Sequence, residues 1–150
     1  MSEKQFISWK QYIQDIGLLG DTLDRVGFNN VQIVGLSRGG LIPASILSYR
    51  FNTRPIILDV RSYDGEDQSN VIINVNNFPL LANYKRLLIV DDLIDSGHTL
   101  KETIKLIQGA YPETKIHTAV VYSKDVKRNI EANFYVRNLP DRWLVFPYDN

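Results

Sequence analysis

Hydrophobic residues recur along this chain in short runs, separated by polar turns. Four of the runs are short and rich in branched side chains, namely 31–36, 55–60, 87–90 and 116–122, and the run 87–90 is continuous. Such runs are typical of parallel strands that are covered on both faces, because a strand buried on both sides needs no alternation with polar residues. They predict the centre of a parallel sheet.

Three segments near these runs carry apolar residues at spacings of three and four, which indicates helices that face a core. They are 8–26, with Ser8 as the N-cap candidate, 41–51, with Pro43 in its first turn, and 100–107, which ends before Gly109 and Pro112. Strand, turn and helix therefore alternate. The pattern predicts an α/β fold with a mostly parallel central sheet flanked by helices.

Other segments do not follow this alternation. Residues 61–70 are polar and predict a mobile loop, with 71–75 as a flanking strand. Residues 134–136 predict a short strand, and 139–148 are rich in aromatic residues and proline with little periodicity, which indicates an aromatic cap. No linker or repeat interrupts the chain, so we expect 1–150 to form a single domain.

The amino-acid composition argues against several classes of function. Lys plus Arg and Asp plus Glu number 17 each, so the chain has no general attraction for nucleic acid or anionic membranes. The absence of cysteine excludes disulfides, thiolate zinc sites and a cysteine nucleophile. No run approaches the ~20 apolar residues that span a bilayer, and no signal peptide is apparent. We expect a cytoplasmic protein without a membrane span.

Three carboxylates follow the run 87–90. Asp91, Asp92 and Asp95 come at the carboxyl end of a predicted strand, where open α/β sheets bind ligands. Gathered carboxylates repel one another, and a cation or a hydroxyl-rich ligand would relieve that cost. The alternative is that Asp91 and Asp92 cap neighbouring turns.

Two polar turns have the character of anion cradles. Residues 96–99 open a helix, where N–H groups and hydroxyls can surround a phosphate, although Ser96 or Thr99 could equally be an ordinary N-cap. Residues 37–40 place Arg38 among glycines after another strand, in a pattern that is neither a Walker loop nor a dinucleotide fingerprint. Together with the acidic residues, the two cradles suggest a substrate with two phosphorylated ends, neutralised by Mg²⁺ or another cation.

These residues carry a family resemblance. Segment 86–99, RLLIVDDLIDSGHT, resembles the signature of the type I phosphoribosyltransferases. Other residues resemble the bacterial xanthine-guanine (6-oxopurine) phosphoribosyltransferases in their order and approximate spacing. They are Ser37 to Gly40, Ser62-Tyr63-Asp64, Gln68, Tyr111-Pro112, and Trp143 before Pro147. The resemblance covers nearly the whole chain.

The resemblance implies a site for 5-phosphoribosyl 1-diphosphate (PRPP), with the 5-phosphate on 95–99, the ribose near the acid pair and the diphosphate on 37–39. The implied PRPP-binding residues are Ser37, Arg38, Gly39, Asp91, Asp92, Asp95, Ser96, Gly97, His98 and Thr99. The resemblance implies that Mg²⁺ would contact oxygens of PRPP, the phosphoribosyl donor, with Asp92 as its protein contact. Loop 61–70 would close over the reacting centre.

For the purine, the resemblance implies that Lys124 donates to the 6-oxo group, that Trp143 stacks on the ring and that the Leu144 backbone lies near the 2-position. Residues 134–150 would contribute a small C-terminal hood over this base. Arg38 would stabilise the leaving diphosphate, and Asp95 would accept or orient the purine N7 proton. Taken alone, Trp143 could be a core residue and Lys124 a solvated lysine.

The expected function is purine salvage: transfer of the phosphoribosyl group to guanine, xanthine or hypoxanthine with release of diphosphate. The implied partners are small-molecule substrates, not nucleic acid, and the implied assembly is a homodimer or homotetramer. Two alternatives stay open, namely another base as acceptor (orotate, uracil or adenine) and a regulator of the same fold that binds nucleic acid. One departure from the family is Ser69, where members carry an arginine, and Arg61 is the candidate replacement.

Overall fold

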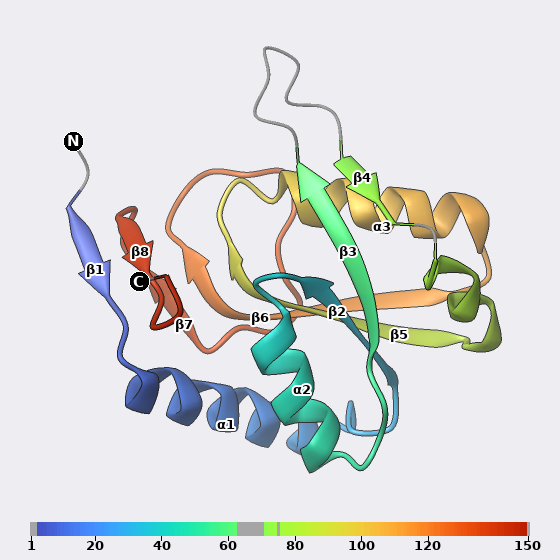
Figure 1. Cartoon of the computed structure of the whole chain (residues 1–150), viewed down its shortest axis with the longest axis horizontal. Coiled ribbons are helices and arrows are strands. Elements are labelled where there is room, and N and C mark those ends of the chain that lie inside the picture. The colour runs from blue at the N-terminus through green and yellow to red at the C-terminus, as the bar shows by residue number, and fades with distance from the viewer. Residues whose placement is uncertain (1–2, 63–70, 75, 150) are drawn as a thin grey trace.

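A six-stranded sheet forms the centre of the structure, a computed structural model that describes residues 3–62, 71–74 and 76–149 (Figure 1). Its strand order is β4-β3-β2-β5-β6-β7. The strands are β2 (Gln32–Ser37), β3 (Ile56–Ser62), β4 (Val71–Ile73), β5 (Arg86–Ile94), β6 (Lys115–Lys124) and β7 (Arg137–Leu139). All neighbours pair in parallel except β3 and β4, which are antiparallel. The predicted fold class is confirmed.

Helices cover both faces of this sheet. Figure 1 shows α1 (Trp9–Arg25) and α2 (Leu41–Arg50) on one side and α3 (His98–Ala110) on the other. Along β5, Leu88 and Val90 pack into the core with α1 and α2, whereas Leu87 and Ile89 pack into the core with α3. Both faces of the strand are buried, which explains why its apolar run is continuous. At the start of α1, the Ser8 hydroxyl accepts from the Gln11 N–H at 3.1 Å, so the predicted N-cap is confirmed.

The structure corrects two predicted boundaries. Strand β5 continues four residues beyond Val90, so Asp91 and Asp92 lie inside the strand and not after it. The strand expected at 134–136 is instead β7, further along the chain. Phe134 forms only an isolated bridge with Ala119, and the ladder with β6 begins at Arg137, opposite Tyr122. Between these two pairings the Val136 N–H bonds the Val121 carbonyl, which is not the partner that a regular ladder continued from Phe134 would use.

Three short elements have no counterpart in the predictions: β1 (Lys4–Phe6), the 3-10 helix η1 (Phe78–Asn83) and β8 (Trp143–Val145). Strands β1 and β8 pair in parallel and form a separate two-stranded sheet. This small sheet lies beside the main sheet, at the same side of the molecule as the start of α1 (Figure 1). It gives the predicted aromatic cap a scaffold that joins the two ends of the described chain.

Within the described ranges, no helix combines the length and the apolar character needed to cross a membrane.

His117 should make the stability of the fold sensitive to mild acid. Its ring packs edge-on against Phe28 at a centroid distance of 4.6 Å, and its Nδ1 is buried without a hydrogen-bond partner among residues 3–62, 71–74 and 76–149. Burial, with help from the charges of Arg86 and Lys115, lowers the His117 pKa below its ordinary value of 6.5. The fold therefore keeps this histidine neutral and loses stability as the pH falls below 6.5. We expect a smaller loss of melting temperature between pH 7.5 and 5.5 in His117→Gln than in the unmodified protein, measured by circular dichroism. Equal losses would contradict the prediction.

Candidate active site

An acid pair occupies the carboxyl-terminal half of β5. Asp91 and Asp92 are both half-buried, and the Asp92 N–H donates to Asp91 Oδ1 at 2.9 Å. Burial raises the pKa of each carboxyl group, and the charge of Asp92 raises the pKa of Asp91 further. In the described part of the chain, no lysine or arginine forms an ion pair with either group. Because both residues lie inside a strand, capping of a turn does not explain them.

The acid pair suits a magnesium ion that is shared with a substrate. Mg²⁺ takes oxygen ligands and is commonly held by one or two carboxylates plus substrate phosphates. The described residues contain no group of three or more His, Cys, Asp or Glu side chains placed to hold a metal. Two carboxylates without a compensating cation therefore fit a metal that takes its other ligands from a bound molecule and water. Asp92 Oδ1, which no described side chain contacts by a hydrogen bond, is the oxygen best placed for this role.

The turn at 37–40 packs directly against the acid pair. A Cβ atom at Gly39 would lie 2.5 to 2.6 Å from the atoms of the Asp92 carboxyl group, and a Cβ at Gly40 would lie 2.4 Å from the Val90 carbonyl oxygen. Position 40 therefore requires glycine, and a side chain at position 39 would displace the Asp92 carboxyl group. Arg38 lines a cavity of about 630 Å³ together with Gly39 and Asp92, so the predicted cradle does lie beside the predicted metal ligand.

A second cavity, of about 500 Å³, lies on the β3 side of this turn and is lined by Ser37, Arg38, Asp59, Val60 and Arg61. The Ser37 hydroxyl donates to Asp59 Oδ1 at 3.0 Å, and Arg61 pairs with Asp59 Oδ2 at 3.3 Å. The structure thus places Arg61 beside Ser37 and Arg38, and its role as the replacement for the loop arginine stays a prediction. The loop residues Tyr63, Asp64, Gln68 and Ser69 lie outside the described residues.

The other cradle follows β5 directly. Gly97 has φ of +80°, a conformation that favours glycine, and α3 begins at the next residue, His98. Gly97 takes the N-cap position, so neither Ser96 nor Thr99 does, although the Ser96 hydroxyl accepts from the His98 N–H at 3.3 Å. Residues 91–100 and Val120 enclose a cavity of about 180 Å³. The acid pair and the helix start therefore share one small pocket.

Lys124 and Asp95 form an ion pair at the ends of neighbouring strands β6 and β5. Their Nζ and Oδ2 atoms are 3.1 Å apart. Lys124 is only 6% exposed, so it is not an ordinary solvated lysine, whereas Asp95 is exposed. The pair presents one cationic donor and one anionic acceptor side by side.

The sequence analysis missed Arg128, which holds this ion pair in place. Its side chain is 3% exposed, and its Nη1 donates to the backbone carbonyls of Lys124 at 2.6 Å and Asp95 at 3.3 Å. An arginine in a polar loop gives no periodic or motif signal of such a role. Arg128 also pairs with Glu131, which is only three residues away in sequence, whereas its hydrogen bond to Asp95 joins segments that are distant in sequence.

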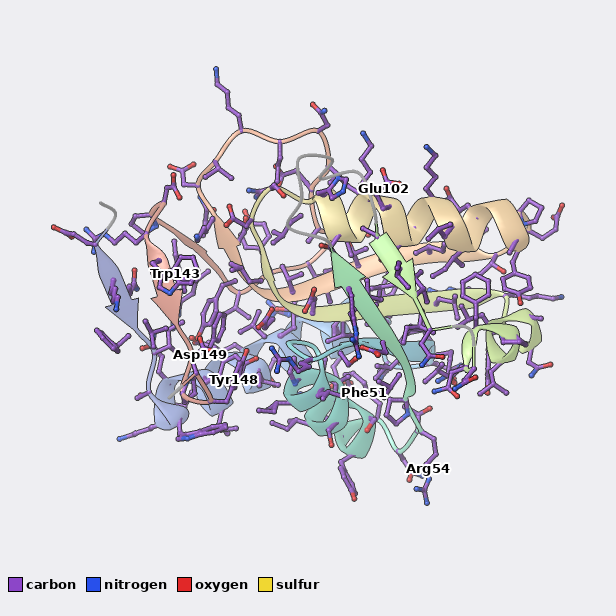
Figure 2. All side chains as sticks on the ribbon, turned by 45° about the horizontal axis from the view of Figure 1, so that its top comes forward. Phe51, Arg54, Glu102, Trp143, Tyr148 and Asp149 are labelled. Carbon is purple, nitrogen blue, oxygen red and sulfur yellow. The ribbon has the colours of Figure 1, made fainter. Side chains whose placement is uncertain are left out.

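Trp143 and Leu144 lie on β8. Trp143 is 62% exposed, so core packing does not explain it. The Trp143 N–H donates to the Glu3 carbonyl, and the Val145 carbonyl accepts from the Ile7 N–H. Because backbone groups alternate in direction along a strand, the N–H and C=O of Leu144 point away from β1. Figure 2 shows Trp143 on the same side of the molecule as Tyr148 and Asp149, away from Phe51 and Arg54.

Comparisons with known proteins agree with this geometry. The model of the phosphoribosyl transferase domain family matches residues 5–146. A xanthine-guanine phosphoribosyltransferase of Cereibacter sphaeroides is 35% identical over 153 residues, covering 98% of this chain and 88% of that protein.

Solved structures show the same fold. A purine phosphoribosyltransferase of Pyrococcus horikoshii has a TM-score of 0.82 at 30% identity, covering 98% of this chain and 95% of that one. A xanthine-guanine-hypoxanthine phosphoribosyltransferase of Helicobacter pylori has a TM-score of 0.81 at 21% identity, covering 98% and 94%. The strand order, the acid pair and the two glycine-dependent turns, together with these matches, establish that the chain belongs to the phosphoribosyl transferase domain family.

Proposed function

We propose that this protein is a purine salvage enzyme that transfers the 5-phosphoribosyl group from PRPP to guanine, xanthine or hypoxanthine and releases diphosphate. The observation that carries the proposal is the acid pair with a glycine-dependent cradle on each side. The names of the related enzymes point to the same chemistry. In this proposal Asp92 is the protein ligand of Mg²⁺, which neutralises the diphosphate when it is bound.

The donor would lie across the acid pair. Its 5-phosphate would bind the N–H groups and hydroxyls of 95–99, its ribose hydroxyls would contact Asp91 and Asp92, and its diphosphate would bind 37–39. A purine nitrogen then attacks the ribose C1 while the bond to diphosphate breaks, through a transition state with oxocarbenium character. The fixed charge of Arg38 stabilises the negative charge that develops on the leaving group.

The ion pair between Lys124 and Asp95 suits a 6-oxopurine. Such a base presents the O6 acceptor and a protonated N7 on adjacent positions of one edge. A cationic donor and a carboxylate 3.1 Å apart match that pattern, with Lys124 donating to O6 and Asp95 accepting from N7. Trp143 would stack on the ring, and the backbone groups of Leu144, which point away from β1, would meet the 2-position. Residues 134–150 would act as the hood over this base site.

The decisive experiment measures diphosphate release with guanine, xanthine and hypoxanthine at equal PRPP and Mg²⁺ concentrations, and with orotate, uracil and adenine as comparison bases. We expect turnover with at least one 6-oxopurine that stops when EDTA removes Mg²⁺. No turnover with any 6-oxopurine, together with no PRPP binding by calorimetry, would overturn the proposal. A cytoplasmic location and assembly as a dimer or tetramer remain predictions.

Arg61 offers a more specific test of the diphosphate cradle. Its side chain is 77% exposed and, among the described residues, forms an ion pair only with Asp59, so it can reach a bound diphosphate. We expect Arg61→Ala to raise the KM for PRPP about 5- to 10-fold, since an arginine–phosphate contact is worth about 1 kcal/mol at an exposed site. The KM for the purine should stay the same in steady-state assays.

The control for this variant is Arg54→Ala, because Arg54 is also exposed and lies away from Trp143 and Tyr148 in Figure 2. It should keep the KM for PRPP of the unmodified enzyme. Equal donor KM values for Arg61→Ala and the unmodified enzyme would show that Arg61 does not touch the diphosphate.

A further inference from the structure

Tyr148, near the end of the described chain, reaches back to the acid pair. Its hydroxyl donates to Asp92 Oδ2 at 2.5 Å, although the two residues are 56 positions apart in sequence. Tyr148 also lines the cavity that contains Arg38, Gly39 and Asp92. Tyr148 belongs to neither cradle, and although it lies in the proposed hood, no contact with the base is assigned to it above.

The aromatic cap fixes the position of this hydroxyl. The Tyr148 ring stacks on Phe146, with a centroid distance of 5.3 Å and an interplanar angle of 10°, and it meets the Tyr12 ring edge-on at 5.9 Å. A turn closes around Pro147, because the Phe146 N–H donates to the Asp149 carboxylate and the Asp149 N–H donates to the Phe146 carbonyl. Tyr148 therefore has little freedom to turn away from Asp92.

The hydrogen bond from Tyr148 makes the two oxygens of the Asp92 carboxylate inequivalent. Oδ2 is taken by Tyr148, whereas Oδ1 makes no hydrogen bond to a described side chain. A carboxylate bound at one oxygen loses rotational freedom, so its second oxygen is presented in a constant direction. Hydrogen bonds of this outer kind commonly orient a carboxylate that binds a metal.

We propose that Tyr148 is a positioning residue that orients Asp92 toward the metal and the donor, an inference that rests on the function proposed above. Trp143 and Leu144 precede Tyr148 on the segment 143–149. In this proposal the segment contributes to the base site through β8 and to the PRPP site through the turn that carries Tyr148. The aromatic cap thereby connects the two substrate sites through the backbone of residues 143–149.

The test is Tyr148→Phe, which keeps the ring and its stacking and removes only the hydroxyl. Mn²⁺ serves as the probe, and its binding to the enzyme with PRPP in the absence of purine is followed by electron paramagnetic resonance, so no turnover is needed. We expect affinity for Mn²⁺ with PRPP to fall about 10-fold, the lower end of the effect of losing a hydrogen bond that orients a metal ligand. The Mg²⁺ concentration for half-maximal activity should rise by a similar factor, with an unchanged KM for the purine.

The matched control is Tyr49→Phe, since Tyr49 on α2 is exposed and makes no hydrogen bond through its hydroxyl among the described residues. Unchanged Mn²⁺ affinity in Tyr148→Phe would overturn the proposal, and so would a parallel rise in the purine and PRPP KM values with a lower melting temperature, which indicates a purely structural role. These outcomes assume an active unmodified enzyme. Failure of the proposed function would appear instead as an unmodified protein that neither binds PRPP nor turns over any 6-oxopurine.

Discussion

Asp92→Asn is expected to lower kcat about 100-fold or more while the protein stays folded. The variant keeps the size of the side chain and an oxygen that can accept from Tyr148, but it loses the charge that would hold Mg²⁺ and face the ribose. Losing one preorganised electrostatic contact of this kind commonly costs a factor of 10² to 10³ in rate. Diphosphate release at saturating PRPP and purine measures the effect.

The same variant should be at least as stable as the unmodified protein without ligands. Burial raises the pKa of Asp92, so the folded state favours the protonated form and ionisation at neutral pH costs stability. That cost is absent below the ordinary carboxyl pKa of 3.8, grows as the pH rises from 3.8 to the raised pKa, and is constant at higher pH. Replacing the charge removes it, and we expect the melting temperature at pH 7 to rise by about 2 to 4 °C, the scale of ~1 kcal/mol in a domain of this size.

Glu102→Gln is the control for this pair of measurements, because Glu102 lies on α3 away from Trp143 and Tyr148 (Figure 2) and makes no ion pair within the described residues. Its activity should stay within twofold of the unmodified enzyme. A folded Asp92→Asn variant with full activity would show that the metal and ribose assignment is wrong.

Asp15→Ala should destabilise the fold more than any other single change considered. Asp15 is 1% exposed on α1, where it accepts from the Tyr122 hydroxyl at 2.6 Å and pairs with Arg137 at 3.0 Å. The carboxylate thus joins α1 to β6 and β7. Alanine would leave the buried Tyr122 hydroxyl without an acceptor and would create a small cavity. We expect a loss of about 2 to 4 kcal/mol in the free energy of unfolding by urea.

The matched control is Asp21→Ala on the same helix. Asp21 pairs with Arg50 at 2.6 Å, but its side chain is well exposed, and exposed ion pairs contribute at most ~1 kcal/mol. If both variants lost the same small amount of stability, the buried pair at Asp15 would not have the structural role assigned to it.

The sequence predicted the centre of the fold because each central strand is a short, mostly apolar run close in sequence to a helical pattern. The apolar run that predicted β5 ends at Val90, four residues before the strand itself ends at Ile94. Pairing of β5 with β6 depends on backbone groups, and the ladder continues through Asp91 opposite Val120 and through Leu93 opposite Tyr122. A carboxylate ends an apolar run in the sequence without ending the strand.

The two cradles were also predictable, because glycine next to a hydroxyl or a positive charge has a local physical meaning. Their positions beside Asp92 and at the start of α3 agree with that interpretation. The contacts of Tyr148 and Arg128 were not predictable. Each depends on a hydrogen bond between segments far apart in the chain, and neither residue stands in a periodic pattern. Strands of three residues, such as β1 and β8, are likewise too short for periodicity to reveal.

The outward direction of the Leu144 backbone has a consequence for how the base site would evolve. In the proposed site, one residue offers a carbonyl to a 2-amino group and an N–H to a 2-oxo group, so guanine and xanthine meet the same main chain. Every amino acid except proline carries both groups, so replacing the side chain at this position leaves the choice of base nearly untouched. The ability to use several purines would then depend on the pairing of β1 with β8, which places Gln5 opposite Leu144, more than on the identity of any one side chain.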